Sequence, residues 1–195
     1  KKFTEKQFHI IDTFIFQNKK TLLTGSAGTG KTLIAIETAR RLASEGKKVL
    51  FVCYNELFGK WLSEVFYNEK NITFERITKL MMFYAGKAKA RFYGDVNLFF
   101  ETLPKEAIES LDKSPIKEQD KYDCLIIDEV QDFLKEEYFY FLEKLCKKGF
   151  DCNMHLFGDV KEQKVYNNTE DINKILTGNF GLEFSYYETK ENCRN

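Results

Sequence analysis

The chain has 195 residues, which is enough for one domain with a small insertion. Its 30 basic and 30 acidic residues cancel, so any nucleic-acid surface must be a local patch and not a property of the whole chain. No apolar stretch could span a membrane, and the start at 1–4 does not resemble a signal peptide. The five scattered cysteines, an odd number, predict a reduced, cytoplasmic protein without a structural metal.

Helical and strand-like patterns alternate along the chain. In order, they predict a helix at 4–16, a strand at 21–24, a helix at 31–44, a strand at 49–54, a helix at 56–66, a strand at 124–127, a helix at 135–147, a strand at 154–157, a helix at 170–176 and a strand at 182–187. This alternation predicts an α/β fold with a mainly parallel sheet covered by helices on both faces. Pro104 and Pro115 flank a charged helical stretch, which predicts a small helical insertion near 85–120.

A phosphate-binding loop pattern follows the first predicted strand, because a glycine and four residues precede Gly-Lys-Thr. The predicted ATP-binding residues are Gly25, Ser26, Ala27, Gly28, Thr29, Gly30, Lys31 and Thr32. Backbone N–H groups of such a loop surround the β-phosphate, and the N-terminus of the next helix adds positive potential. Lys31 would reach the β- and γ-phosphates, and Thr32 would offer its hydroxyl to Mg²⁺.

An acidic pair, Asp128 and Glu129, comes directly after the apolar run at 124–127. Asp128 would hold Mg²⁺ through its water shell, and Glu129 would position and deprotonate the attacking water. Two acids at a strand end are also common in ordinary turns. Together with the loop at 25–32, however, they favour a site that binds and hydrolyses MgATP.

The segment Asp128–Asp132 resembles motif II of superfamily 1 helicases of the UvrD/Rep-like group, and further segments agree in order along the chain. Gln7 stands where this family has a glutamine that reads adenine, although Thr4–Gln7 also has the form of a helix capping box. Residues 49–62 resemble motif Ia, which implies that Asn55 lies on the path of single-stranded nucleic acid. Thr78 resembles part of the next strand-contacting motif, with an ordinary helix cap as the alternative.

Two segments near the C-terminus extend this resemblance. Residues 158–166 resemble motif III, which implies that Gln163 senses the γ-phosphate and that Tyr166 supplies some stacking on a base. This segment has one residue more than the commonest form and lacks the usual tryptophan after Tyr166. Residues 190–195 resemble motif IV, which implies that Arg194 stabilises the transition state, with a basic residue in a solvated tail as the alternative.

The resemblance implies that residues 1–195 are the first RecA-like, P-loop NTPase domain of a DNA helicase, because motifs of a second RecA-like domain are absent. Its catalytic residues would be Glu129, Lys31, Arg194 and Gln163. ATP and Mg²⁺ would be its cofactors. Its partners would be single-stranded DNA, or RNA, and the second RecA-like domain of the same parent chain, without which turnover would be weak.

Other classes of function share parts of this pattern. An ATP-dependent switch that regulates a protein partner, or a fused nuclease or other effector, needs only the phosphate-binding loop and the acidic pair. A small-molecule kinase would need a substrate lid, and a pure binding module would tolerate the loss of Glu129.

Overall fold

The computed structural model describes residues 3–87, 96–133, 135–159 and 174–189. Six strands form one sheet in the order β3-β2-β4-β5-β1-β6, and each neighbouring pair runs parallel. The strands are β1 (Lys20–Gly25), β2 (Val49–Cys53), β3 (Ile72–Arg76), β4 (Cys124–Ile127), β5 (Asn153–Gly158) and β6 (Ser185–Thr189). The helical elements are α1 (Glu5–Ile10), the π-helical turn η1 (Ile11–Ile15), α2 (Lys31–Ser44), α3 (Glu56–Val65), α4 (Ile77–Tyr84), α5 (Val96–Lys113), the 3₁₀ turns η2 (Glu118–Asp120) and η3 (Val130–Asp132), α6 (Glu136–Leu145), the 3₁₀ turn η4 (Gly149–Asp151) and the π-helical turn η6 (Lys174–Asn179).

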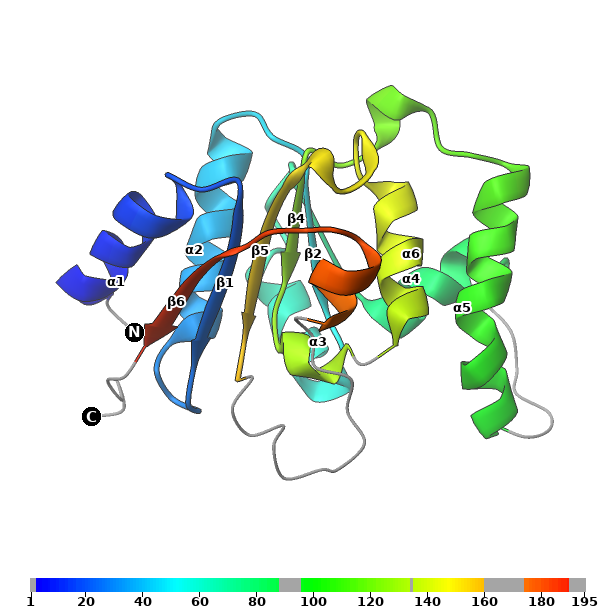
Figure 1. The fold of residues 1–195 in the computed structure, drawn as a ribbon, viewed down its shortest axis with the longest axis horizontal. Coiled ribbons are helices and arrows are strands. Elements are labelled where there is room, and N and C mark those ends of the chain that lie inside the picture. Colours follow the sequence, from blue (N-terminus) through cyan, green and yellow to red (C-terminus); the bar gives the residue numbers. More distant parts are fainter. Residues whose placement is uncertain (1–2, 88–95, 134, 160–173, 190–195) are drawn as a thin grey trace.

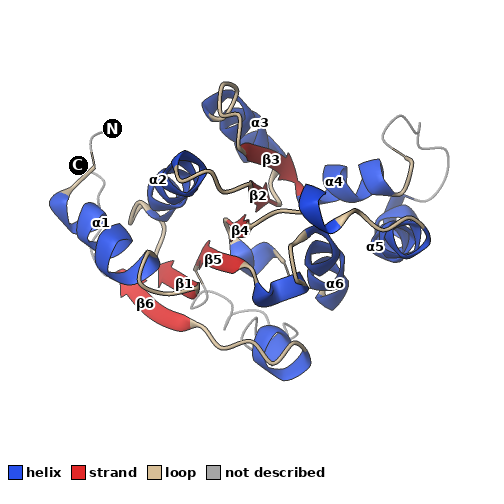
Figure 2. Ribbon diagram, turned by 90° about the horizontal axis from the view of Figure 1, so that it is seen from above, coloured by secondary structure: helices blue, strands red, loops and turns tan. Residues whose placement is uncertain are grey.

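Helices cover both faces of the sheet, as the alternating pattern predicts. Figure 2 shows α1, α2 and α3 on one face and α4, α5 and α6 on the other. Successive side chains of a strand point to opposite faces, so β4 contributes side chains to the hydrophobic cores on both faces of the sheet. Leu125 and Ile127 pack with the α6 side, whereas Cys124 and Ile126 pack with the α2 side. The continuous apolar run of β4 is therefore a consequence of its burial on both faces.

Two strands differ from the sequence-based prediction. The edge strand β3 has no counterpart in the prediction, because its sequence, ITFER, is short and partly charged and it has a single neighbour, β2. The last strand begins at Ser185, three residues later than predicted. The apolar residues Leu182 and Phe184 produced the earlier start, because they pack against the core without joining the ladder.

The helix α5 lies within the range predicted for a helical insertion, but Pro104 lies inside this helix and not at its boundary. Proline removes one backbone hydrogen bond from a helix interior. The buried side chains of Leu103 and Ala107, on the two sides of the proline, anchor both halves of α5 against the core. In the described ranges, no helix is both long and apolar enough to cross a membrane.

Candidate nucleotide-binding site

The phosphate-binding loop joins β1 to α2 at the carboxyl edge of the sheet, the lower edge in Figure 1. The ammonium of Lys31 donates to the carbonyl oxygens of Gly25 at 2.7 Å and Ser26 at 3.1 Å. The hydroxyl of Thr29 also donates to the Ser26 carbonyl, at 2.9 Å. These bonds hold the positive charge of a buried lysine inside the loop, next to the N-terminus of α2, where a phosphate group would be stabilised.

Gln7 connects the N-terminal helix with this loop. The side-chain oxygen of Gln7 accepts from the backbone N–H of Thr4 at 3.0 Å, and the backbone N–H of Gln7 donates to the Thr4 hydroxyl at 3.2 Å. The predicted capping box is therefore present. The residue is buried, and a Cβ added to Gly30 would lie 2.2 Å from its amide nitrogen. Gln7 therefore caps α1 and contacts the loop at the same time. Its role toward adenine stays a prediction.

We expect Gly30→Ala to weaken both stability and nucleotide binding. Gly30 has φ +83°, where a side chain costs about 1–3 kcal/mol, and its Cβ would displace the Gln7 amide. Gly46→Ala is the matched control, because Gly46 has φ +81° with nothing near its Cβ position. Chemical unfolding and ATP-analogue titration of both variants test this. Equal losses in the two variants would show that the Gln7 contact has no energetic role.

Asp128 lies directly after β4 and is fully buried. One carboxylate oxygen, Oδ1, accepts from the Glu129 N–H at 3.0 Å, whereas Oδ2 has no hydrogen bond of normal geometry within the described residues. Burial, followed by the nearby charge of Glu129, raises the pKa of Asp128 to about 7. The Thr32 hydroxyl, the Glu129 N–H and Lys31 oppose this shift. A buried carboxylate beside a hydroxyl and an ammonium is a place where a bound cation would relieve the desolvation cost.

The chemistry of these residues fits Mg²⁺. Mg²⁺ is commonly bound by one or two carboxylates, retained waters and substrate phosphates, and not by a full protein cage. Asp128 and Thr32 supply a carboxylate and a hydroxyl of this kind. In the described ranges, no cluster of three or more His, Cys, Asp or Glu side chains could hold a metal by itself. The predicted pair Thr32 and Asp128 therefore suits a cation that arrives with a nucleotide.

Glu129 follows in a left-handed backbone conformation, with φ 54° and ψ 50°. Such a conformation is uncommon for a residue other than glycine and is often found at functional sites. Its carboxylate oxygen Oε2 accepts from the Gln131 side-chain amide at 2.5 Å. Gln131 was not among the predicted site residues, although its position two residues after Glu129, in the same turn, places it within reach.

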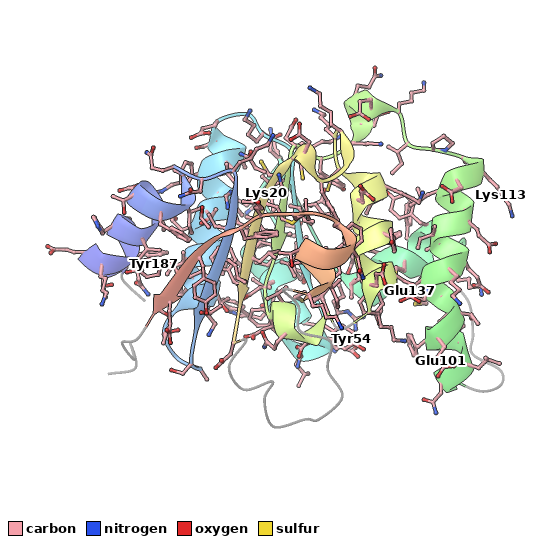
Figure 3. All side chains as sticks on the ribbon, in the orientation of Figure 1. Lys20, Tyr54, Glu101, Lys113, Glu137 and Tyr187 are labelled. Atoms are coloured by element: carbon pink, nitrogen blue, oxygen red, sulfur yellow. The ribbon has the colours of Figure 1, made fainter. Side chains whose placement is uncertain are left out.

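The predicted nucleic-acid residues Asn55 and Thr78 lie after the carboxyl ends of the adjacent strands β2 and β3. Asn55 is exposed and caps α3, since its Oδ1 accepts from the N–H groups of Leu57 at 2.9 Å and Phe58 at 3.2 Å. The helix-cap alternative for Thr78 is wrong, because α4 begins after Arg76 and Thr78 lies within its first turn. Figure 3 places Tyr54, the neighbour of Asn55, at the same edge.

Three further predicted residues, Gln163, Tyr166 and Arg194, lie outside the described residues. The described part of that segment ends at Asp159, directly after β5. Their proposed contacts with ATP and nucleic acid remain predictions from the sequence.

A family model described as "Type III restriction enzyme, res subunit" matches residues 1–156. The Pif1 helicase from Candida albicans is similar in structure, with a TM-score of 0.58 and 14% identity over 98% of this chain and 40% of that chain. AMPPCP-bound DnaA from Aquifex aeolicus has a TM-score of 0.45 and 16% identity, over 94% of this chain and 44% of its own. No curated protein matches significantly.

The chain therefore spans less than half the length of either solved structure. The likeness to Pif1 concerns the fold alone, that of an α/β P-loop NTPase domain. The family match includes both the phosphate-binding loop at 25–32 and the acidic pair at 128–129. Since it extends over most of the sequence, the protein belongs to the family of the type III restriction enzyme res subunit.

Proposed function

We propose that this chain is the first RecA-like motor domain of a superfamily 1 helicase or translocase of the UvrD/Rep-like group, which hydrolyses ATP to move on single-stranded DNA. The observation that carries the proposal is the arrangement at the carboxyl edge of the sheet. There, the loop lysine Lys31 and the hydroxyl of Thr32 both favour the charged form of the buried Asp128 carboxyl group, which Glu129 directly follows. The family match and the helicase-type fold support this reading.

In this mechanism, Lys31 binds the β- and γ-phosphates, and Thr32 and Asp128 hold Mg²⁺. Glu129 accepts a proton from water as the water oxygen bonds to the γ-phosphorus. The bond between that phosphorus and the bridging oxygen breaks, which leaves ADP and phosphate, with the proton on Glu129. Mg²⁺, when bound, neutralises phosphate charge. Gln163 and Arg194 sense and stabilise the γ-phosphate.

The proposed path of single-stranded nucleic acid crosses Asn55, Thr78 and Tyr166. Asn55 and Thr78 follow neighbouring strands that end at the same edge as the nucleotide site, which supports this path. A second RecA-like domain of the same parent chain would close over ATP and convert closure into movement.

We expect ATP turnover by the full-length protein to be stimulated by single-stranded DNA. Glu129→Gln should lower this turnover by about 10²–10⁴-fold, because an amide cannot accept the proton from water. Glu101→Gln is the matched control, since Glu101 is exposed on α5, far from the loop (Figure 3). Steady-state phosphate release with single-stranded DNA, single-stranded RNA or neither measures the effect.

Stimulation by DNA that Glu129→Gln abolishes would support the motor, and stronger stimulation by RNA would identify RNA as the track. Turnover that depends on Glu129 but responds to neither polymer would favour an ATP switch that controls a protein partner. A rate that Glu129→Gln leaves unchanged would contradict the proposed hydrolysis site.

A further inference from the structure

Gln131, in the 3₁₀ turn η3, joins two segments of the candidate site that lie apart in the sequence. Its side-chain N–H donates to Oε2 of Glu129 at 2.5 Å. Its side-chain oxygen accepts from the backbone N–H of Asp159 at 3.0 Å, across 28 positions of sequence. A glutamine side chain offers donors at one end and an acceptor at the other, so one planar amide makes both contacts.

The packing around Gln131 leaves little freedom for this amide. A Cβ added to Gly158, the last residue of β5, would lie 2.4 Å from Oε1 of Gln131 and 2.8 Å from the Val130 side chain. Only a glycine therefore allows the end of β5 to approach η3 this closely. At the start of η3, the backbone of Glu129 has a left-handed conformation, which directs the chain into this turn.

We propose that Gln131 is a positioning residue for ATP hydrolysis, which fixes the carboxylate of Glu129 and ties its position to the backbone at Asp159. This inference rests on the proposed function, in which Glu129 accepts the proton from water. A hydrogen bond from a neutral amide to a carboxylate is charge-assisted, and it orients one oxygen while the other keeps free acceptor capacity.

The same contact links hydrolysis to the end of β5. Because one rigid amide serves both partners, a shift of the Asp159 backbone moves the donor that orients Glu129. Positioning of a catalytic group within a fraction of an ångström strongly affects rate, so this shift changes kcat. Gln131 thus couples the position of the Asp159 backbone to the orientation of the proton acceptor.

Two variants separate the two contacts. Gln131→Leu has a side chain of comparable bulk with neither donor nor acceptor, so it removes both hydrogen bonds. Gln131→Glu keeps an acceptor for the Asp159 N–H but presents an oxygen to Glu129 where the amide donor stood. Gln119→Leu is the matched control, because Gln119 is exposed in η2, just before β4, at the opposite edge of the sheet.

The first measurement is kcat and KM for ATP in the full-length protein, with the affinity for a non-hydrolysable ATP analogue. We expect Gln131→Leu and Gln131→Glu to lower kcat by about 10- to 100-fold, part of the contribution of a general base. The analogue affinity should change by less than about threefold, because Gln131 acts through Glu129 and not on the phosphates. In a Glu129→Gln background, Gln131→Leu should cause no further loss.

The second measurement needs no turnover. Hydrogen exchange at the Asp159 backbone amide should be faster in Gln131→Leu than in the wild type, because the accepting oxygen is lost. The amide should stay protected in Gln131→Glu and in the Gln119→Leu control. Thermal unfolding of each variant shows whether the fold is retained.

The inference is overturned if Gln131→Leu lowers kcat by the same factor in the wild-type and the Glu129→Gln backgrounds. It is also overturned if Gln131→Leu lowers the affinity for the analogue as much as it lowers kcat. Wild-type exchange at Asp159 in Gln131→Leu would also overturn it. If any of these results is found while Glu129→Gln alone abolishes hydrolysis, the inference on Gln131 fails and the proposed function is retained. Turnover that is insensitive to Glu129→Gln would overturn both.

Discussion

Lys31→Ala is expected to weaken ATP binding by about a hundredfold or more. Its ammonium is buried and held inside the loop by the carbonyl oxygens of Gly25 and Ser26. Removal of one partner from a buried, hydrogen-bonded charge pair costs about 2–5 kcal/mol, and each 1.4 kcal/mol is about a tenfold change in affinity. Titration with a fluorescent ATP analogue, with and without Mg²⁺, measures this loss directly.

The control for this variant is Lys19→Ala. Lys19 is exposed, pairs with Asp151 at 2.7 Å and precedes β1, at the amino edge of the sheet. We expect this control to bind the analogue like the wild type. If Lys31→Ala kept wild-type affinity while its thermal unfolding was also unchanged, the loop would not be a phosphate site.

Asp128→Asn is expected to abolish the part of the pH dependence of stability that Asp128 causes in the protein without nucleotide. Burial raises the pKa of Asp128 to about 7, above the value of an unfolded aspartate. Between about pH 4 and pH 7 the folded state therefore binds more protons at this residue than the unfolded state does. The contribution of Asp128 to stability is thus present at low pH and is lost as the pH rises through the folded pKa.

Between pH 5 and pH 8, the free energy of unfolding of the wild type should accordingly fall by about 2–4 kcal/mol because of this residue. The Asp128→Asn variant should not show this fall. Thermal unfolding in EDTA, across that range, measures the difference. Asp120→Asn, an exposed residue in η2, is the control. Added Mg²⁺ with an ATP analogue should stabilise the wild type at pH 8 and not Asp128→Asn, since the cation compensates the buried charge. Equal pH slopes in both proteins would contradict the role assigned to Asp128.

The elements next to the site were predictable because their signals are local. The phosphate-binding loop and the acidic pair are short patterns that follow apolar runs, and the structure places them after β1 and β4 at one edge of the sheet. The alternation of strands and helices predicted the layered fold, because a parallel sheet buries both of its faces under helices.

The errors came from segments whose fate depends on distant neighbours. The edge strand β3 is short and partly charged, and its pairing with β2 stabilises it as a strand. Pro104 is tolerated inside α5 because Leu103 and Ala107 are buried against elements from other parts of the chain. No pattern confined to one segment carries this information.

The sequence by itself determined the chemistry offered to a ligand, namely a glycine-rich loop with Lys31 and Thr32 and an acidic pair, Asp128 and Glu129. Only the tertiary structure decided how these groups are tuned. It placed the Gln7 amide against Gly30, buried Asp128 so that its pKa rises, and joined Glu129 through Gln131 to Asp159. The physical reason is that residue types fix donors, acceptors and charges, whereas burial and contacts between remote segments arise only when the strands assemble into one sheet.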